Sequence, residues 1–323
     1  IFMYILMIVL SADIIRLILK YVFHASWIHS RVAFAIAGAI CIFSVLLISI
    51  RGIYHAKHIN VTPYEVTVDK SAGELDSLKI VLIADTHFGY NAGTIHAKEI
   101  VKKINKQNPD LVCIAGDIFD NEYDAIRNPE KLEKTLRGIK STYGVYACWG
   151  NHDLNEEILA GFTFKHKDGD LSDIKDPRMK KFLEDSNIHI LEDESVLIND
   201  QFYVIGRKDA SLTEKIHETR KAPAQLTEKL DRDKPIIMID HQPKELQELA
   251  DAGVDLDLCG HTHNGQTFPG NFTIKLMWEN PCGLLSKDNM TNITTSGAGV
   301  WGPAMRIGTD SEICSINIQL KKD

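Results

Sequence analysis

The sequence predicts an α/β domain in which two packed sheets are covered by helices, with apolar helical segments before it. Three observations lead to this prediction. Strand-like and helix-like patterns alternate between residues 78 and 149, strand-like runs dominate after residue 188, and a 19-residue run without charge stands near the start. Alternating strands and helices are typical of βαβ units, and strands in succession need a second layer to bury them.

Composition and charge place the chain among globular proteins. Of its 323 residues, 44% are hydrophobic and 25% are charged, which permits a sizeable core. Residues 1–60 carry five basic residues and one acidic residue, a charge of +4. The remainder of the chain carries 31 basic and 43 acidic residues, a charge of −12. Because nucleic-acid-binding domains usually present a basic face, nucleic acid is disfavoured as a partner. The six cysteines form no CxxC pair, so free thiols are predicted rather than disulfides or metal ligands.

The uncharged run Val32–Ile50 predicts a membrane-spanning helix. Its 19 residues, flanked by Arg31 and Arg51, would extend about 28 Å as a helix, close to the thickness of the bilayer core. A buried core helix is the alternative. The apolar run Ile1–Leu10 is interpreted as the end of a truncated earlier membrane helix that passes into an interfacial turn. The basic residues are nearly balanced between the two ends, so the orientation stays open.

These features divide the chain into three parts. Residues 1–53 are predicted to be membrane segments, 54–75 a polar linker and 76–323 the globular domain. The protein is therefore expected to be integral to the cell membrane, with the side of the globular domain undetermined.

Hydrophobic periodicity and turn residues give the order of elements in the domain. Helices are predicted at 94–107, 129–140, 178–185, 211–220 and 243–251. Strands are predicted at 78–84, 110–115, 143–149, 188–191, 195–199, 202–206, 236–240, 255–259, 292–296 and 313–319.

Polar side chains follow each of the first three strands. Asp85 and His87 come directly after the first strand and point to the same side of an extended backbone. Asp117 follows the second strand after a glycine that permits a tight turn, and Asn151 follows the third. Taken singly, these motifs are equally consistent with a surface loop, an Asx turn or a turn before a helix.

Two later strands end in the same way. His241 ends the strand at 236–240, where a lone histidine is more often structural than a ligand. His261 and His263 follow the strand at 255–259, after a glycine. In open α/β sheets ligands gather at the carboxyl ends of strands, so all five motifs are expected to meet.

The combined set of donors indicates the kind of metal. It offers two aspartates, one asparagine and four histidines, with no thiolate. Mixed nitrogen and oxygen donors suit manganese, iron or zinc. Seven donors are too many for one ion, so two divalent ions that share a bridging carboxylate are predicted.

This ordered set of motifs resembles the calcineurin-like metallophosphoesterase superfamily, whose blocks run D-x-H, G-D, G-N-H-[DE], H and G-H-x-H. All five blocks occur in order between Asp85 and His263, and the resemblance covers about residues 78–319. Residues 295–299 (TSGAG) and the Gly265-Gln266 pair also resemble the membrane-associated bacterial branch. The resemblance implies a four-layer α/β/β/α sandwich.

The resemblance also implies a role for each metal-binding residue. One ion would be bound by Asp85, His87 and His263, the other by Asn151, His241 and His261, and both by the bridging Asp117.

By the same resemblance, His152 is the histidine that faces the substrate. Asp120 is expected to orient His152, and Asp153 is the competing candidate.

The implied activity is hydrolysis of a phosphomonoester, phosphodiester or pyrophosphate bond by metal-activated water. The membrane segments favour a lipid-linked substrate. A nucleotide phosphodiesterase and a phosphoprotein phosphatase are alternatives, and a non-catalytic membrane sensor that binds a phospholigand is a further one. The sequence leaves protein partners undetermined.

A loop and four other side chains are candidates to contact the substrate. Residues 161–177 are predicted as a loop or small lid, with a solvated insertion as the alternative. Its candidate contacts are Phe162, Phe164, Lys165, His166 and Lys167. Further candidates to line the cleft are Phe88, Asn264, Trp278 and Trp301.

Overall fold

The computed structural model describes residues 1–156, 158–159, 162–163 and 175–322. The candidate contacts Phe164, Lys165, His166 and Lys167 of the predicted lid lie outside these residues. A short hairpin, β5 (Ile158–Leu159) with β6 (Phe162–Thr163), is all that is described between residues 157 and 174.

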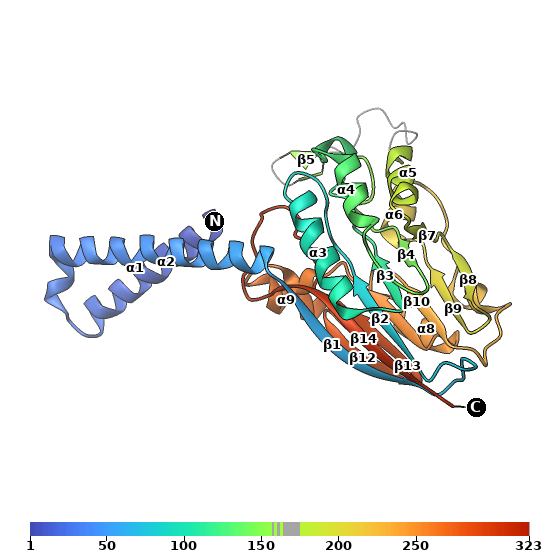
Figure 1. The fold of residues 1–323 in the computed structure, drawn as a ribbon. Helices are drawn as coiled ribbons and strands as arrows, with labels where there is room; N and C mark the ends of the chain where they lie inside the picture. Colours follow the sequence, from blue (N-terminus) through green and yellow to red (C-terminus); the bar gives the residue numbers. More distant parts are fainter. Residues whose placement is uncertain (157, 160–161, 164–174, 323) are drawn as a thin grey trace.

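Two antiparallel helices precede the domain (Figure 1). They are α1 (Phe2–Tyr21) and α2 (Arg31–Lys57), joined by a short 3₁₀ turn (Ser26–His29). Each is long and apolar enough to cross a membrane. The predicted interfacial turn after Leu10 is wrong, because α1 continues as one helix to Tyr21 and simply carries its polar residues on a helical face.

The segment predicted as a linker is structured. Helix α2 runs through residues 54–57, and strand β1 (Ile59–Val68) begins after the single residue His58. β1 lies at the edge of a sheet and pairs with β14 (Ser311–Leu320). Its polar residues and Pro63 hide it in the sequence, and an edge position is one of the few places where a strand tolerates proline.

The first sheet has the strand order β1-β14-β2-β3-β4-β7. The remaining strands are β2 (Ser77–Ile83), β3 (Leu111–Ala115), β4 (Val145–Cys148) and β7 (His189–Ile190), and these four are parallel. Three helices pack on its outer face: α3 (Thr94–Gln107), α4 (Pro129–Leu136) and α5 (Pro177–Asp185).

The second sheet has the order β12-β13-β11-β10-β9-β8. Its strands are β8 (Glu194–Ile198), β9 (Phe202–Gly206), β10 (Ile236–Ile239), β11 (Leu256–Cys259), β12 (Gly283–Lys287) and β13 (Met290–Thr294). Helices α7 (Pro223–Thr227) and α8 (Leu246–Asp251) pack on its outer face. Between the strands lie α6 (Ala210–Lys215), α9 (Gly270–Met277) and 3₁₀ turns at Tyr123–Ala125 and His263–Gly265.

The inner faces of the two sheets form a common core. Apolar side chains of β2 and β3, such as Leu82 and Leu111, pack with those of β10 and β11, such as Ile237 and Leu258. The predicted four-layer α/β/β/α fold is therefore confirmed. All six cysteines are free, as predicted. The packing brings the carboxyl ends of β2, β3, β4, β10 and β11 to one edge, where the polar motifs lie.

Candidate metal centre

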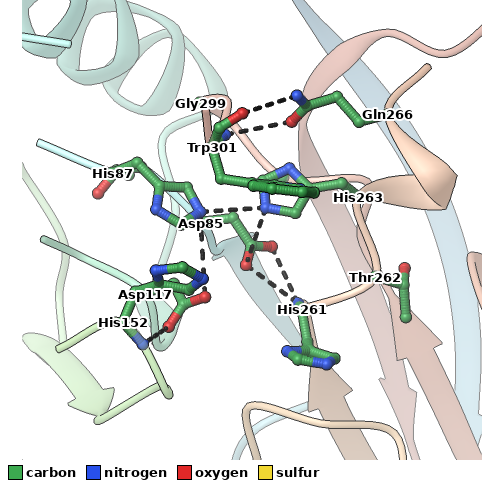
Figure 2. A network of polar contacts seen from close by, with 12 residues as sticks. Asp85, His87, Asp117, His152, His261, Thr262, His263, Gln266, Gly299 and Trp301 are labelled. Atoms are coloured by element: carbon green, nitrogen blue, oxygen red, sulfur yellow. Dashed lines mark hydrogen bonds and ion pairs between the residues drawn. The ribbon is translucent and has the colours of Figure 1, made fainter. Parts of the chain in front are cut away.

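The predicted metal-binding side chains converge at the carboxyl ends of five strands. They follow β2, β3 and β4 of the first sheet and β10 and β11 of the second. Figure 2 shows five of them, joined by dashed lines to one another or to their neighbours: Asp85, His87, Asp117, His261 and His263. Five of the seven are buried: Asp85, His87, Asp117, His241 and His263. Burying so many polar groups is unfavourable unless they are bonded to each other or to an ion.

The first cluster contains Asp85, His87 and His263. The Nε2 atoms of His87 and His263 are 3.1 Å apart, and His263 Nε2 is 3.6 Å from Asp85 Oδ1. One donor atom from each residue lies within 4.8 Å of the others, which is a separation that one ion could fill.

The second cluster contains Asn151, His241 and His261. His241 Nε2 is 3.1 Å from Asn151 Oδ1 and 3.2 Å from His261 Nδ1. His241 Nδ1 faces the carbonyl of Ala115 at 2.8 Å, which fixes the ring with Nε2 toward the cluster.

Asp117 lies between the two clusters. Its Oδ2 atom is 3.2 Å from His241 Nε2 and 3.9 Å from His87 Nε2. Its Oδ1 atom accepts a hydrogen bond of 2.7 Å from the backbone N–H of His152. One carboxylate is thus within reach of both groups of ligands.

The backbone at the ligands has left-handed dihedral angles, which non-glycine residues rarely adopt. Positive φ angles occur at five of the predicted ligands: Asp85 (54°), His87 (44°), Asp117 (49°), His261 (70°) and His263 (49°). Each such residue is strained by about 1–3 kcal/mol, and strain of this kind concentrates at functional sites. Backbone hydrogen bonds between the loops, such as His87 N–H to Asp117 O, hold these angles.

Two glycines allow the loops to approach the ligands. A Cβ atom on Gly150 would lie 2.2 Å from Asp117 Oδ1, and one on Gly260 would lie 2.6 Å from Asp85 Oδ2. Any side chain at these positions would therefore displace a carboxylate of the predicted ligand set.

Burial and mutual charge shift the titration of the ligands. Burial raises the pKa of Asp85 to about 6, against the opposing effect of His241. Burial alone would raise the pKa of Asp117, but His241 and His152 hold it well below its usual range. The pKa of His241 is well above its usual range, because Asp117 outweighs its burial. Asp85 and His241 thus keep their protons to higher pH than usual, and a bound cation would displace these protons.

The predicted partner of His152 is wrong. His152 Nδ1 lies 2.6 Å from Asn121 Oδ1. Asp120 lies instead with its Oδ1 atom 3.6 Å from His87 Nδ1, because the backbone at 118–120 pairs with Phe88 and directs this side chain to the β2 loop. The competing candidate Asp153 accepts hydrogen bonds from the backbone N–H groups of Phe119 and Gly150.

A cavity of about 790 Å³ opens over the metal-binding residues. His152, His261 and His263 line it, and so do Trp278 and Trp301, as predicted for the two tryptophans. Gln266 holds the backbone of Trp301 with hydrogen bonds of 3.2 and 2.8 Å (Figure 2). Phe88 is buried instead of lining the cavity, and Asn264 is not among the described lining residues.

Arg306 is a supporting residue that the sequence did not reveal. Its buried guanidinium donates to the carbonyl oxygens of Ser296 at 2.5 Å, Gly299 at 2.8 Å and His263 at 3.2 Å. Burial lowers its pKa to about 10. Neither Arg306 nor Asn121 stands in one of the motifs, so only the folded structure brings them to the site.

Comparisons with known proteins identify the family of this domain. Residues 78–265 match the family model described as calcineurin-like phosphoesterase. An uncharacterized metallophosphoesterase of Campylobacter jejuni is 32% identical over 271 residues, which cover 81% of this chain and 64% of that protein. A transmembrane protein with metallophosphoesterase domain from Danio rerio is 32% identical over 269 residues, covering 79% and 56%.

A third relative has a named activity. The UDP-2,3-diacylglucosamine pyrophosphatase LpxG of Chlamydia trachomatis is 24% identical over 298 residues, covering 79% of this chain and 88% of that protein. The chain spans less than two thirds of the length of the Campylobacter and Danio proteins.

Proposed function

The chain belongs to the calcineurin-like phosphoesterase family, and from that premise we propose that it is a membrane-anchored hydrolase of phosphate esters or anhydrides that uses two divalent ions. The observation that carries the proposal is the position of Asp117, within 3.2 Å of His241 and 3.9 Å of His87, between two groups of ligands. Such an arrangement suits a carboxylate that bridges two ions.

The residues present fit divalent ions of intermediate softness. Their donors are carboxylate and amide oxygens and imidazole nitrogens, the set that suits manganese, iron or zinc. When bound, two such ions supply a water of lowered pKa and positive charge for the phosphoryl oxygens. The side chains of Asp85, His87 and His263 would hold one ion, those of Asn151, His241 and His261 the other.

His152 acts on the phosphate from the base of the cavity. Its Nδ1 donates to Asn121 Oδ1, so Nε2 carries a proton only when the ring is charged. Burial lowers the pKa of His152, against the opposing effect of Asp117. A bound phosphate favours the charged ring, which stabilises the leaving oxygen or gives it the Nε2 proton.

The substrate we favour is a lipid-linked phosphate. Two helices long and apolar enough to cross a membrane precede the domain, and we propose that they make the chain an integral protein of the cell membrane. The acyl-bearing sugar nucleotide in the name of the Chlamydia relative points in the same direction. A nucleotide phosphodiesterase and a phosphoprotein phosphatase are the competing activities.

The test uses the full chain in detergent. The protein is stripped of metal with a chelator and assayed on p-nitrophenyl phosphate and bis-p-nitrophenyl phosphate, before and after addition of Mn²⁺. We expect turnover only with metal, and a His152→Ala variant that binds metal but turns over at least about 100-fold more slowly. Metal binding without turnover on either ester or on lipid-linked phosphates would favour the non-catalytic sensor instead.

A further inference from the structure

We propose that helix α9 and the aromatic residues beside it lie on the surface of the bilayer that α1 and α2 cross, so that the metal centre opens toward lipid and receives its substrate from the membrane plane. The inference rests on the membrane anchoring proposed above. In addition to the two helices that cross the bilayer, the globular domain itself would then contact the bilayer, through α9.

The order of strands turns the metal centre toward the anchor. β1 begins one residue after α2, and Ile59 at its start pairs with Ser311 at the start of β14. β14 runs antiparallel to β2, and its residue Cys314 pairs with Leu82 near the end of β2. The carboxyl end of β2, which leads into Asp85, therefore lies at the edge of the sheet where α2 enters the domain (Figure 1).

The anchor is packed against the domain instead of being tethered to it. The backbone N–H of Arg306 donates to Gly52 O at 2.9 Å, and Ser311 Oγ donates to Ala56 O at 3.0 Å. A Cβ atom on Gly52 would lie 3.2 Å from Ile307 Cγ1. These contacts fix the direction of the metal centre relative to the axis of α2.

The segment that leads into α9 touches the other anchor helix. Tyr4, in the first turn of α1, donates its hydroxyl to Phe268 O at 2.6 Å. Phe268 N–H in turn donates to Ile307 O at 2.9 Å, in the loop against α2. Helix α9 thus begins where both helices meet the domain, and Figure 1 shows it at the end of the domain nearest to them.

Helix α9 has two apolar faces. One face lines the cavity over the metal centre, with residues at helical spacing: Gly270, Thr273, Ile274 and Met277. The opposite face carries Phe272 and Leu276, which are 62% and 88% exposed, with Lys275 between them. Exposed apolar residues beside a basic one are typical of a helix that lies in the membrane interface.

Aromatic residues continue this surface around the cavity. Tyr90 and Trp301 line the cavity and are also exposed, and Phe268 is partly exposed beside α9. Tyrosine and tryptophan are enriched where a protein meets the boundary between lipid and water. If α1 and α2 cross a bilayer, that bilayer lies at this end of the domain. It is therefore the partner that these exposed apolar residues would meet.

The experiment is photocrosslinking to lipid. The photoreactive residue p-benzoylphenylalanine replaces Leu276 in the full chain, reconstituted in vesicles of phosphatidylethanolamine and phosphatidylglycerol. Leu197 in β8, an exposed leucine on the strand furthest from the anchor in Figure 1, is the matched control. Phe34 in α2 reports on the anchor itself. We expect lipid adducts at 276 and 34 and few at 197.

Three outcomes would contradict the surface contact of α9, and one of them would also contradict the membrane anchoring. A yield at 276 no higher than at 197, with adducts at 34, would overturn the surface contact and leave the anchoring intact. Lack of adducts at 34 as well would overturn both. In a second series the probe replaces Phe272, and Leu276→Glu is added. The charge should reduce the adducts severalfold while Leu197→Glu leaves them unchanged, and an equal yield in both would contradict the proposal.

Discussion

The two sheets contribute different chemistry to the same centre. Loops after the first sheet supply every oxygen donor of the predicted ligand set, from Asp85, Asp117 and Asn151, together with the imidazole of His87. Loops after the second sheet supply only imidazoles: His241, His261 and His263. Each cluster draws on both sheets, so neither sheet alone holds a complete set. The centre therefore depends on the packing between the two sheets as much as on the sequence motifs.

The largest loss of activity is expected when the residue shared by both clusters is changed. Asp117→Asn keeps the size of the side chain but removes the charge. Changes of residues that merely support ligands lower metal affinity or activity about 10–100-fold, so loss of this ligand should lower turnover by more than about 100-fold. Steady-state assays with Mn²⁺ measure this, and thermal unfolding checks that the variant is folded. Activity close to that of the parent chain would remove Asp117 from its shared role.

Changing one ligand from each sheet should have a smaller and more selective effect. Asp85→Asn belongs to one cluster and His261→Gln to the other. We expect each variant to lose about half of its bound metal in elemental analysis by mass spectrometry, because the other cluster keeps its own ligands. If either variant keeps the full metal content, that residue is not a ligand.

The pH dependence of metal binding sharpens the contrast between individual ligands. The pKa of Asp85 is raised to about 6 by burial, and that of His241 is raised because Asp117 outweighs its burial. A raised pKa means that the folded protein keeps the proton to higher pH, whereas a metal ion binds the deprotonated form. Burial lowers the pKa of His261 to about 3, so it does not compete.

Mn²⁺ affinity should therefore fall as the pH falls from 8 to 6, by about tenfold per pH unit for each proton displaced. Titration calorimetry in buffers of different ionisation enthalpy measures both the affinity and the protons released. An affinity that stays constant over this range would contradict the raised pKa of His241, because Asp85, with a pKa of about 6, contributes only near the lower end of the range.

The smallest effect is expected at Asn121, which lies in the loop after β3 and contacts the ring of His152. Asn121→Ala removes the acceptor of His152 Nδ1 and should lower kcat about tenfold, since orienting partners of catalytic imidazoles have effects of this order. Metal content should not change. Asp153→Asn is the comparison, because the partners of Asp153 among the described residues are the backbone N–H groups of Phe119 and Gly150, and it should lower the melting temperature more than kcat. The reverse pattern would restore Asp153 as the orienting residue.

The convergence of the predicted ligands could be foreseen from the sequence because each follows an apolar run that indicates a buried strand. Local pattern was sufficient for Asp85 and Asp117, where the strand, the turn and the polar residue are contiguous. It failed where a role depends on contacts across the chain. Asn121 meets His152 only through the packing of two loops, and β1 is an edge strand whose polar residues read as a linker.

Helix α9 was missed for a related reason. Its eight residues include Gly270 and carry apolar side chains on both faces, so they lack the one-sided pattern of a helix that packs on a core. The left-handed backbone at His261 and His263 likewise has no local signature, because only a few per cent of non-glycine residues adopt it. It is held in place by the folded loops.

The contact between Gly52 and Arg306 has a practical consequence for anyone who wants a soluble fragment. Cutting at the junction of α2 and β1 would leave the amide of Arg306 and the hydroxyl of Ser311 without their acceptors, while the guanidinium of Arg306 still supports the carbonyl of His263. A fragment that begins at Arg51 keeps these contacts and should retain metal better than one that begins at Ile59. Inactivity of the shorter fragment would therefore reflect the loss of these contacts, and it would not count against the proposed chemistry.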